Sequence, residues 1–258
     1  MDHFEGCSFR PELPEGVDLR NMRILLHCCC APCSTAILEW MVEEGLRPGV
    51  FFSNSNIVPF EEYVKRRDEL ARYAASFGLE VIDDEYDHGS WLEYVRCRLV
   101  SLSNHGPSTG SGTALAGPER GPRCQACFEF RLLRAAEYAA SRGYNILTTT
   151  LASSRWKDLS QVDAAGRLAV ASVEPSVLEG TWKADIRRPA GAGLRESEVM
   201  EPERPQGVWG RPSPQLRWWG QNWRKGGLQE RRNFLIKSCA LYNQTWCGCE
   251  FSSPPPIK

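Results

Sequence analysis

Residues 23–33 read RILLHCCCAPC, a short apolar run that ends in four thiols within six positions. The apolar part, 23–27, is typical of a buried strand, and the apolar spacing of 35–45 after the proline predicts a helix. The thiols of this turn belong to Cys28, Cys29, Cys30 and Cys33. A turn so rich in sulfur favours a site where soft ligands bind a soft metal or where electrons are exchanged.

The alternation of strand and helix continues along the chain. Strands are expected at 50–53 and 79–82 on either side of a helix at 59–77, and a strand at 144–150 follows a helix at 128–142. This order favours an α/β fold with a parallel sheet and right-handed crossovers. Ligands of such sheets bind at the carboxyl ends of the strands, and the thiol turn lies at one of these ends.

Two segments lack this periodicity. The segment 104–122 is rich in glycine and proline, and 170–214 is also irregular, which predicts a loop and an insertion. We expect a single catalytic domain over 1–258 that contains both. No apolar run approaches the ~20 residues of a membrane span, so we expect no membrane partner.

The cysteines are clustered. The chain has 11 of them, an odd number that disulfides within one chain cannot consume. Besides the thiol turn there are a C-x-x-C at Cys124 and Cys127 and a C-G-C at Cys247 and Cys249. The acidic N-terminal segment shows no apolar signal sequence, so we expect a reducing, cytoplasmic compartment, where clustered cysteines indicate metal binding or catalysis. No role is assigned to the isolated Cys7, Cys97 and Cys239.

Four of these cysteines form a natural set of metal ligands. Cys29, Cys30, Cys124 and Cys127 supply four thiolates, the usual complement of an iron–sulfur cluster. Structural zinc is the alternative, although an adjacent pair suits the separate iron corners of a cluster better than one tetrahedral ion. The C-x-x-C precedes a predicted helix, whose N-terminal dipole favours thiolates.

The C-G-C pair suggests a second chemistry. A single glycine between Cys247 and Cys249 permits a very small disulfide ring, and strained disulfides are redox-active. We interpret the pair as a two-electron relay from an external electron donor to the cluster. Two further metal ligands, or two inert thiols, are the alternative.

Charge and aromatic residues limit the nucleic-acid contacts. The net charge is −1, from 31 basic and 32 acidic residues, so any contact with a nucleic acid must be local. Residues 217–225 combine three tryptophans with basic residues, which can stack on bases or pack inward. His27 precedes the thiols on an apolar strand and is expected to support the site rather than bind metal.

Five ordered blocks carry a family resemblance. They read HCCCAPC at 27–33, RCQAC at 123–127, TTTL at 148–151, NWRK at 222–225 and LYNQTWCGC at 241–249. Together they resemble the cobalamin-independent epoxyqueuosine reductases, the QueH family. The resemblance implies a three-layer Rossmann-like (HUP-like) parallel sheet flanked by helices, with a C-terminal helical extension that carries cysteines. It also implies reduction of epoxyqueuosine to queuosine at the wobble position of tRNA, with a [4Fe-4S] cofactor.

Matched position by position, the resemblance assigns roles to the thiols. Cys29, Cys30, Cys124 and Cys127 are the implied cluster ligands, Cys247 and Cys249 are the implied redox-active pair, and Cys28 is left without a role. Some family members have an acidic residue at the position of Cys33, where an additional iron is expected, so Cys33 is a candidate ligand for that iron. The irregular segments 104–122 and 170–214 depart from the shorter family core.

Two other functions compete with this prediction. Reductases of adenylyl sulfate also bind one cluster through a Cys-Cys pair and a distant C-x-x-C, but they contain a phosphate-binding loop that this sequence lacks. A zinc-stabilised RNA-binding module would explain the thiols without any catalysis.

Overall fold

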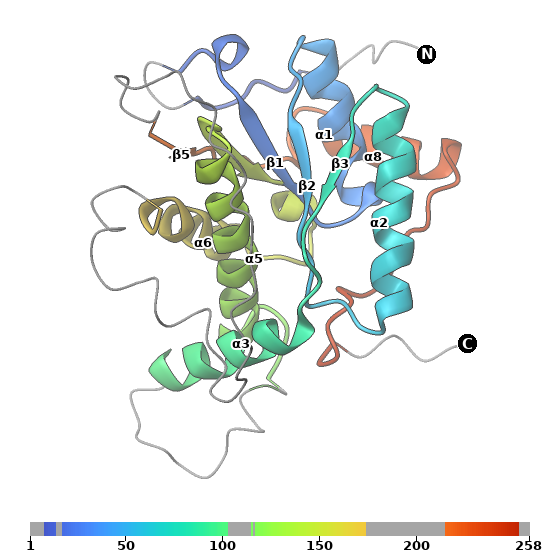
Figure 1. Ribbon diagram of the computed structural model, residues 1–258. Coiled ribbons are helices and arrows are strands. Elements are labelled where there is room, and N and C mark those ends of the chain that lie inside the picture. Colours follow the sequence, from blue (N-terminus) through green and yellow to red (C-terminus); the bar gives the residue numbers. More distant parts are fainter. Residues whose placement is uncertain (1–7, 14–16, 103–114, 116, 174–214, 253–258) are drawn as a thin grey trace, which may run out of the picture.

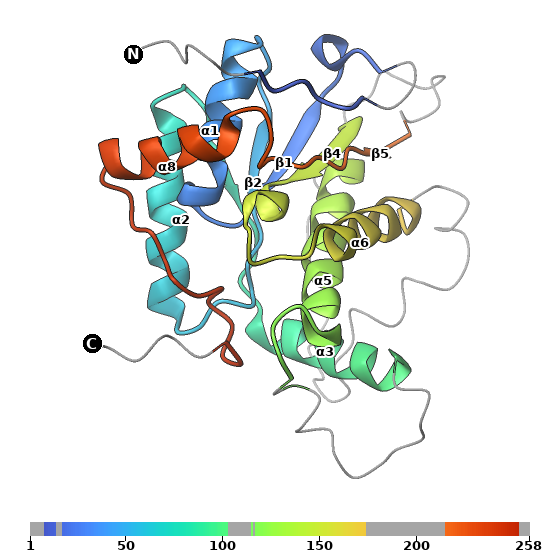
Figure 2. The same cartoon turned by 180° about the vertical axis from the view of Figure 1, so that it is seen from behind.

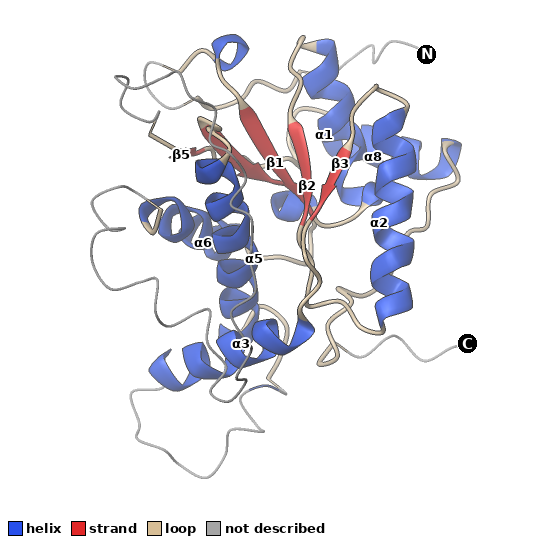
Figure 3. Cartoon of the chain, in the orientation of Figure 1, coloured by secondary structure: helices blue, strands red, loops and turns tan. Residues whose placement is uncertain are grey.

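The protein forms one five-stranded parallel sheet in a computed structural model that describes residues 8–13, 17–102, 115, 117–173 and 215–252. The strand order is β3-β2-β1-β4-β5 (Figures 1 and 3). The strands are β1 (Ile24–Cys28), β2 (Gly49–Phe52), β3 (Val81–Asp83), β4 (Ile146–Thr149) and β5 (Arg217–Trp218). The predicted α/β fold with a parallel sheet is therefore confirmed.

Helices cover both faces of the sheet. The helices α1 (Ala31–Glu43), α2 (Phe60–Ala75) and α8 (Leu228–Ser238) lie on one face, whereas α5 (Pro122–Ser141) and α6 (Leu159–Ala171) lie on the other (Figures 1 and 2). Helix α3 (His88–Leu102) packs against α5, and the short 3-10 helices η1 (Leu19–Asn21) and η2 (Thr150–Ser153) complete the elements. This is the three-layer arrangement that the resemblance implied.

The order of the strands places a crevice beside the thiols. The chain winds from β1 outward to β3 and then returns to β4 on the other side of β1, so the winding direction reverses between β1 and β4. Parallel sheets bind ligands outside the carboxyl ends of the strands at such a reversal. Cys28 ends β1 and Thr149 ends β4, so the turn with Cys29 and Cys30 lies at this point.

The central strands are apolar because both of their faces are covered. Leu25 and Leu26 of β1 are fully buried, as are Val50 of β2 and Leu147 of β4. Strands of parallel sheets that are buried on both faces read as continuous hydrophobic runs rather than as alternating patterns. The strand predicted at 23–27 is such a strand. It is observed one residue later, as β1.

Two helices begin earlier than their apolar periodicity predicts. Helix α5 begins at Pro122, not Phe128, because proline at the first turn has no N–H to leave unpaired. Helix α1 likewise begins at Ala31, with Pro32 in its first turn. Cys33, Cys124 and Cys127 therefore lie within the first two turns of helices, where the helix dipole favours thiolates.

Three elements have no counterpart in the sequence prediction: α3, α6 and β5. Two of them carried a readable signal. In α3 the buried Trp91, Val95 and Leu99 recur every fourth residue, which is helical spacing. Helix α6 begins after Asp158, whose carboxylate accepts hydrogen bonds from two amides of the first turn.

The tryptophans of 217–225 pack inward. Trp219 and Trp223 are 1 % and 2 % exposed, and their rings lie 5.4 Å apart beside Trp40. Trp218 Nε1 donates to Asp163 Oδ1 at 2.7 Å. Of the two alternatives for this segment, the structure supports the inward packing, and base stacking by these rings is excluded by their burial.

Most of the two irregular segments lies outside the described residues, namely 103–114, 116 and 174–214. Among the helices that the structure does describe, none has the length and apolar character needed to cross a bilayer.

Candidate metal and redox site

A single cavity of about 1120 Å³ brings the three cysteine groups together at the carboxyl ends of the strands. Its lining includes Cys29, Cys30 and Cys33 from the β1–α1 turn, Cys124 and Cys127 from α5, and Cys247 and Cys249 from the C-terminal segment. The structure therefore places all seven predicted site residues around one space, although more than 200 residues separate the first from the last. Cys28 is buried in β1 and does not line the cavity.

The tightest group of thiols is in the first turn. The sulfur atoms of Cys29, Cys30 and Cys33 all lie within 4.8 Å of one another, and Cys29 Sγ is 3.8 Å from Cys30 Sγ. Hydrogen bonds from the thiols of Cys30 and Cys33 hold the pKa of Cys29 well below its usual value, whereas burial raises the pKa of Cys30. Three sulfur atoms at this spacing could hold a soft metal ion.

Backbone and side-chain contacts fix this turn. The Cys29 amide donates to Thr150 Oγ1 at 3.1 Å, and Asn54 Nδ2 donates to the carbonyl of Cys28 at 3.0 Å. Ser34 Oγ donates to the carbonyl of Cys30 at 2.8 Å. The turn is thus held from η2, from the loop after β2 and from its own helix.

His27 supports the site from within β1. Its Nε2 lies 3.1 Å from the carbonyl oxygen of Ser53, which only accepts, so Nε2 carries the proton, and Nδ1 accepts from Thr149 Oγ1 at 2.7 Å. Burial and the charge of Arg131 lower the pKa of His27 to about 3, so the ring is neutral at pH 7. Both nitrogens are engaged away from the thiols, which agrees with the expected supporting role.

Helix α5 supplies the second group of thiols. Burial raises the pKa of Cys124 and of Cys127, and the charge of Cys247 raises both further, so the C-G-C loop lies close to the C-x-x-C. Arg131, on the same helix, donates to the Ser53 carbonyl at 3.2 Å and also contacts Asn54 Oδ1. The helix that carries the C-x-x-C is therefore tied to the loop that holds the thiol turn.

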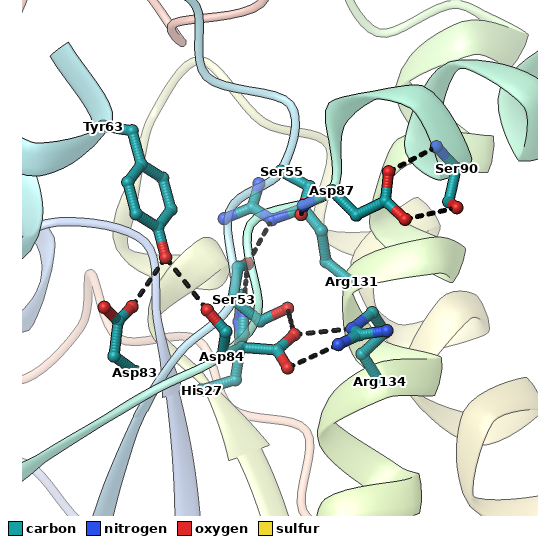
Figure 4. A network of polar contacts seen from close by, with 10 residues as sticks. All are labelled: His27, Ser53, Ser55, Tyr63, Asp83, Asp84, Asp87, Ser90, Arg131 and Arg134. Atoms are coloured by element: carbon teal, nitrogen blue, oxygen red, sulfur yellow. Dashed lines mark hydrogen bonds and ion pairs between the residues drawn. The ribbon is translucent and has the colours of Figure 1, made fainter. Parts of the chain in front are cut away.

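A polar network fixes the ends of the strands on this side (Figure 4). Asp84, after β3, accepts two hydrogen bonds from Arg134 of α5 at 2.6 and 2.7 Å and a third from Ser53 Oγ at 2.6 Å. Such charge-assisted, two-point contacts are stronger than single neutral ones. They hold the carboxyl ends of β2 and β3 against α5.

The C-G-C loop is held by one arginine of α2. Arg66 is 3 % exposed, donates to the carbonyl of Cys247 at 3.1 Å and pairs with Glu62 at 2.6 Å. The amide of Val58 donates to the carbonyl of Gly248 at 2.9 Å. These contacts hold the loop in the lining of the cavity, next to Cys127.

The two thiols of this loop differ in acidity. A hydrogen bond from Cys249 lowers the pKa of Cys247 to about 5, and the same contact raises the pKa of Cys249. Cys247 Sγ also lies 2.7 Å from Ser252 Oγ. A thiolate beside a protonated thiol is the arrangement of a reactive dithiol. All ten cysteines among the described residues are free thiols, so the disulfide between Cys247 and Cys249 stays a prediction.

The lining is strongly basic. Its charged residues in the described part of the chain are eight cations and a single carboxylate: Arg66, Arg120, Arg123, Arg131, Arg155, Lys157, Arg224 and Arg232, against Glu119. Burial acts to lower the pKa of Lys157, but the charge of Cys29 and Cys33 outweighs it and raises that pKa. On a chain with a net charge of −1, this excess of cations is local to the cavity lining.

The donor set fits a metal centre that binds through sulfur. Five thiols from two elements line one buried space, and soft thiolates select zinc, copper(I) or iron–sulfur sites. The predicted set combined Cys29 and Cys30 with the C-x-x-C, whereas the tightest sulfur group also includes Cys33. The sequence analysis did not identify Arg66, Trp91 or Lys157, which act through distant contacts and carry no local motif, and it gave no role to Arg123 of the RCQAC block.

Comparisons with known proteins identify the family. A family model described as epoxyqueuosine reductase QueH matches residues 24–196 and 208–254. Epoxyqueuosine reductase QueH of Haemophilus influenzae is 30% identical over 241 residues, which cover 93% of this chain and 74% of the relative. The protein of the same name from Acinetobacter baylyi is also 30% identical, with 93% and 83% covered, and that from Thermotoga maritima is 28% identical, with 89% of each covered. The chain belongs to the epoxyqueuosine reductase QueH family.

Proposed function

We propose that the chain reduces epoxyqueuosine to queuosine in tRNA, with a [4Fe-4S] cluster bound by Cys29, Cys30, Cys124 and Cys127. Membership of the family makes it an oxidoreductase of queuosine biosynthesis. The observation that supports the cofactor assignment is the convergence of two thiol groups on one cavity whose lining also contains the Cys247 and Cys249 thiols. A cluster bound there would supply electrons, and an additional iron would polarise the epoxide oxygen.

The dithiol matches the stoichiometry of the reaction. Conversion of an epoxide to an alkene breaks both C–O bonds, consumes two electrons and two protons, and releases the oxygen as water. Oxidation of the Cys247 thiolate and the Cys249 thiol to a disulfide releases two electrons and one proton, and the second proton of the reaction comes from solvent. We propose that this pair passes electrons inward and that an external electron donor then reduces the disulfide.

The cavity suits a nucleotide. Its volume of about 1120 Å³ exceeds that of most small-molecule pockets, and its cations would neutralise the phosphates of an anticodon loop. The buried amide oxygens Asn56 Oδ1 and Gln244 Oε1 line it without a hydrogen-bond partner among the described residues. They are available to accept from ribose hydroxyls or from the base.

Two cations are placed to act on the reacting end of the substrate. Lys157 is held charged by the thiol turn, and Arg131 lies behind Ser53 and Asn54. We propose that Lys157 stabilises negative charge on the departing oxygen and that Cys33 is a ligand of the additional iron. Both side chains face the cavity beside Cys29.

Anaerobic purification followed by iron, sulfide and zinc analysis tests the cofactor. We expect about four iron and four sulfide per chain, with iron above four where the additional site is filled. Zinc without sulfide would contradict the assignment and favour an RNA-binding module. For substitutions of the cavity cysteines, Cys97→Ser is the matched control, because Cys97 is exposed on α3 and does not line the cavity.

Incubation with epoxyqueuosine-containing tRNA and a strong reductant tests the reaction. Nucleoside analysis should show queuosine in place of epoxyqueuosine. Turnover of adenylyl sulfate with none on tRNA would overturn the proposal.

A further inference from the structure

Two buried side chains that line the cavity have N–H groups without an acceptor in the described part of the chain. Trp91 is 0 % exposed and Arg123 is 2 % exposed, and both line the cavity. Trp91 Nε1 and the Nε and Nη1 atoms of Arg123 have no hydrogen-bond partner among the described residues. A buried donor without an acceptor costs free energy, and a buried guanidinium costs more, so the acceptor is expected inside the cavity.

Both donors lie beside the C-x-x-C. Trp91 belongs to the same apolar cluster as Cys127 and Cys249, and its ring lies 6.4 Å from that of Phe251. The Arg123 guanidinium lies 5.5 Å from the Phe251 ring, and Arg123 directly precedes Cys124 on α5. The nearest acceptor chemistry is therefore sulfur.

A similar donor exists on the opposite side of the cavity. Thr150 Oγ1 lies 3.5 Å from Cys29 Sγ and already accepts from the Cys29 amide, so its own proton is free to point at the sulfur. The candidate donors beside the proposed ligand thiols thus come from α3, α5 and η2. A donor at each of several ligands is the arrangement that tunes an iron–sulfur site.

We propose that Trp91 and Arg123 donate N–H···S hydrogen bonds to the sulfur of the metal centre on its C-x-x-C side and thereby raise its reduction potential. The inference rests on the proposed function, because it requires a cluster at these thiols. A hydrogen bond withdraws charge from the sulfur, and a cation does so more strongly, so the more negative, reduced form is stabilised. The two residues are positioning residues that act through the ligands.

The alternative for Arg123 is a substrate phosphate. A phosphate contact would weaken tRNA binding in an Arg123 variant but leave the potential of the centre unchanged. Trp91 is fully buried, and its indole can donate only one hydrogen bond. A single acceptor can therefore serve both Trp91 and Arg123 only if that acceptor is the metal centre.

The test is a potentiometric titration of the purified holoprotein, followed by the electron paramagnetic resonance signal of the reduced cluster. The variants are Trp91→Phe, which removes the N–H and keeps an aromatic ring, Arg123→Gln, which removes the charge, and Arg123→Lys, which keeps it. We expect wild-type iron and sulfide content in each. The midpoint potential should fall in Trp91→Phe and in Arg123→Gln, and fall less in Arg123→Lys.

The control is Trp156→Phe, since Trp156 lines the same cavity but is 60% exposed and should leave the potential unchanged. Wild-type potential in Trp91→Phe and Arg123→Gln, with iron retained, would overturn the inference and leave the proposed function intact. Loss of iron from all variants would also overturn it, since the side chains would then be required for binding rather than for tuning. Zinc alone in the wild-type protein would overturn both proposals.

Discussion

The thiol turn and the C-G-C loop face the same cavity but are held in different ways. The thiol turn continues directly from β1, which pairs with strands on both sides, and three hydrogen bonds fix its backbone. The C-G-C loop belongs to no helix or strand, and its main attachments are Arg66 and a backbone hydrogen bond from Val58. One half of the site continues directly from the sheet, whereas the other is held by one side chain and one backbone hydrogen bond.

This difference fits the proposed division of work. Metal ligands must keep a fixed geometry, and a turn at the carboxyl end of a central strand provides it. A dithiol that exchanges electrons with an external donor must be accessible and able to change geometry when a disulfide forms. The following variants test whether the two halves are separable.

Cys29→Ser should have the largest effect. Cys29 is the most acidic thiol of the turn and a proposed cluster ligand, so we expect loss of bound iron and of all turnover. Iron analysis and the nucleoside assay measure both. Retention of full iron content would remove Cys29 from the ligand set.

Cys247→Ser should abolish turnover with the physiological donor while iron content stays at the wild-type level. The serine hydroxyl keeps the size of the thiol but cannot form a disulfide with Cys249. Loss of iron in this variant would mean that the C-G-C loop also binds metal, and the distinction between the two halves would fail.

Arg66→Gln should loosen the loop without emptying the thiol turn. The variant removes the ion pair of Glu62, which keeps only its hydrogen bond from the Tyr242 hydroxyl, and leaves two loop carbonyls without a donor, so we expect unfolding free energy to fall by about 3 kcal/mol. Alkylation of Cys247 should become faster, while iron content changes little. Arg72→Gln on the same helix is the control, because Arg72 is exposed and its only described carboxylate contact is at 3.9 Å. Equal alkylation rates in the two variants would contradict the proposed role of Arg66.

Gly248→Ala should have the smallest effect of the four. Gly248 has φ +96°, and a Cβ there would lie 2.9 Å from Ile57 Cγ1, so both backbone and packing resist a side chain. We expect a loss of about 1 to 2 kcal/mol in unfolding free energy and slower electron transfer from the dithiol. Gly78→Ala separates the two causes, since Gly78 has φ +67° and no neighbour within 4 Å. An identical loss in both would assign the whole effect to the backbone.

Prediction from sequence succeeded where the signal is local. The strand before the thiols, the C-x-x-C at a helix start and the C-G-C pair were each visible within ten residues. The boundaries of α1 and α5 were wrong by several residues because proline was treated as lying before each helix rather than inside its first turn. Helix α3 was missed although Trp91, Val95 and Leu99 have helical spacing, and it supplies one wall of the cavity.

The sequence alone determined the chemistry of this protein: clustered thiols, an α/β alternation and five ordered blocks that carry the family resemblance. Only the tertiary structure decided which groups meet. It placed Cys33 within 4.8 Å of Cys29 and Cys30, buried the tryptophans of 217–225, and brought Arg66 to a loop 180 residues away. The physical reason is that a residue's chemical type is local to the chain, whereas burial and the partners of a charge depend on which distant elements pack together.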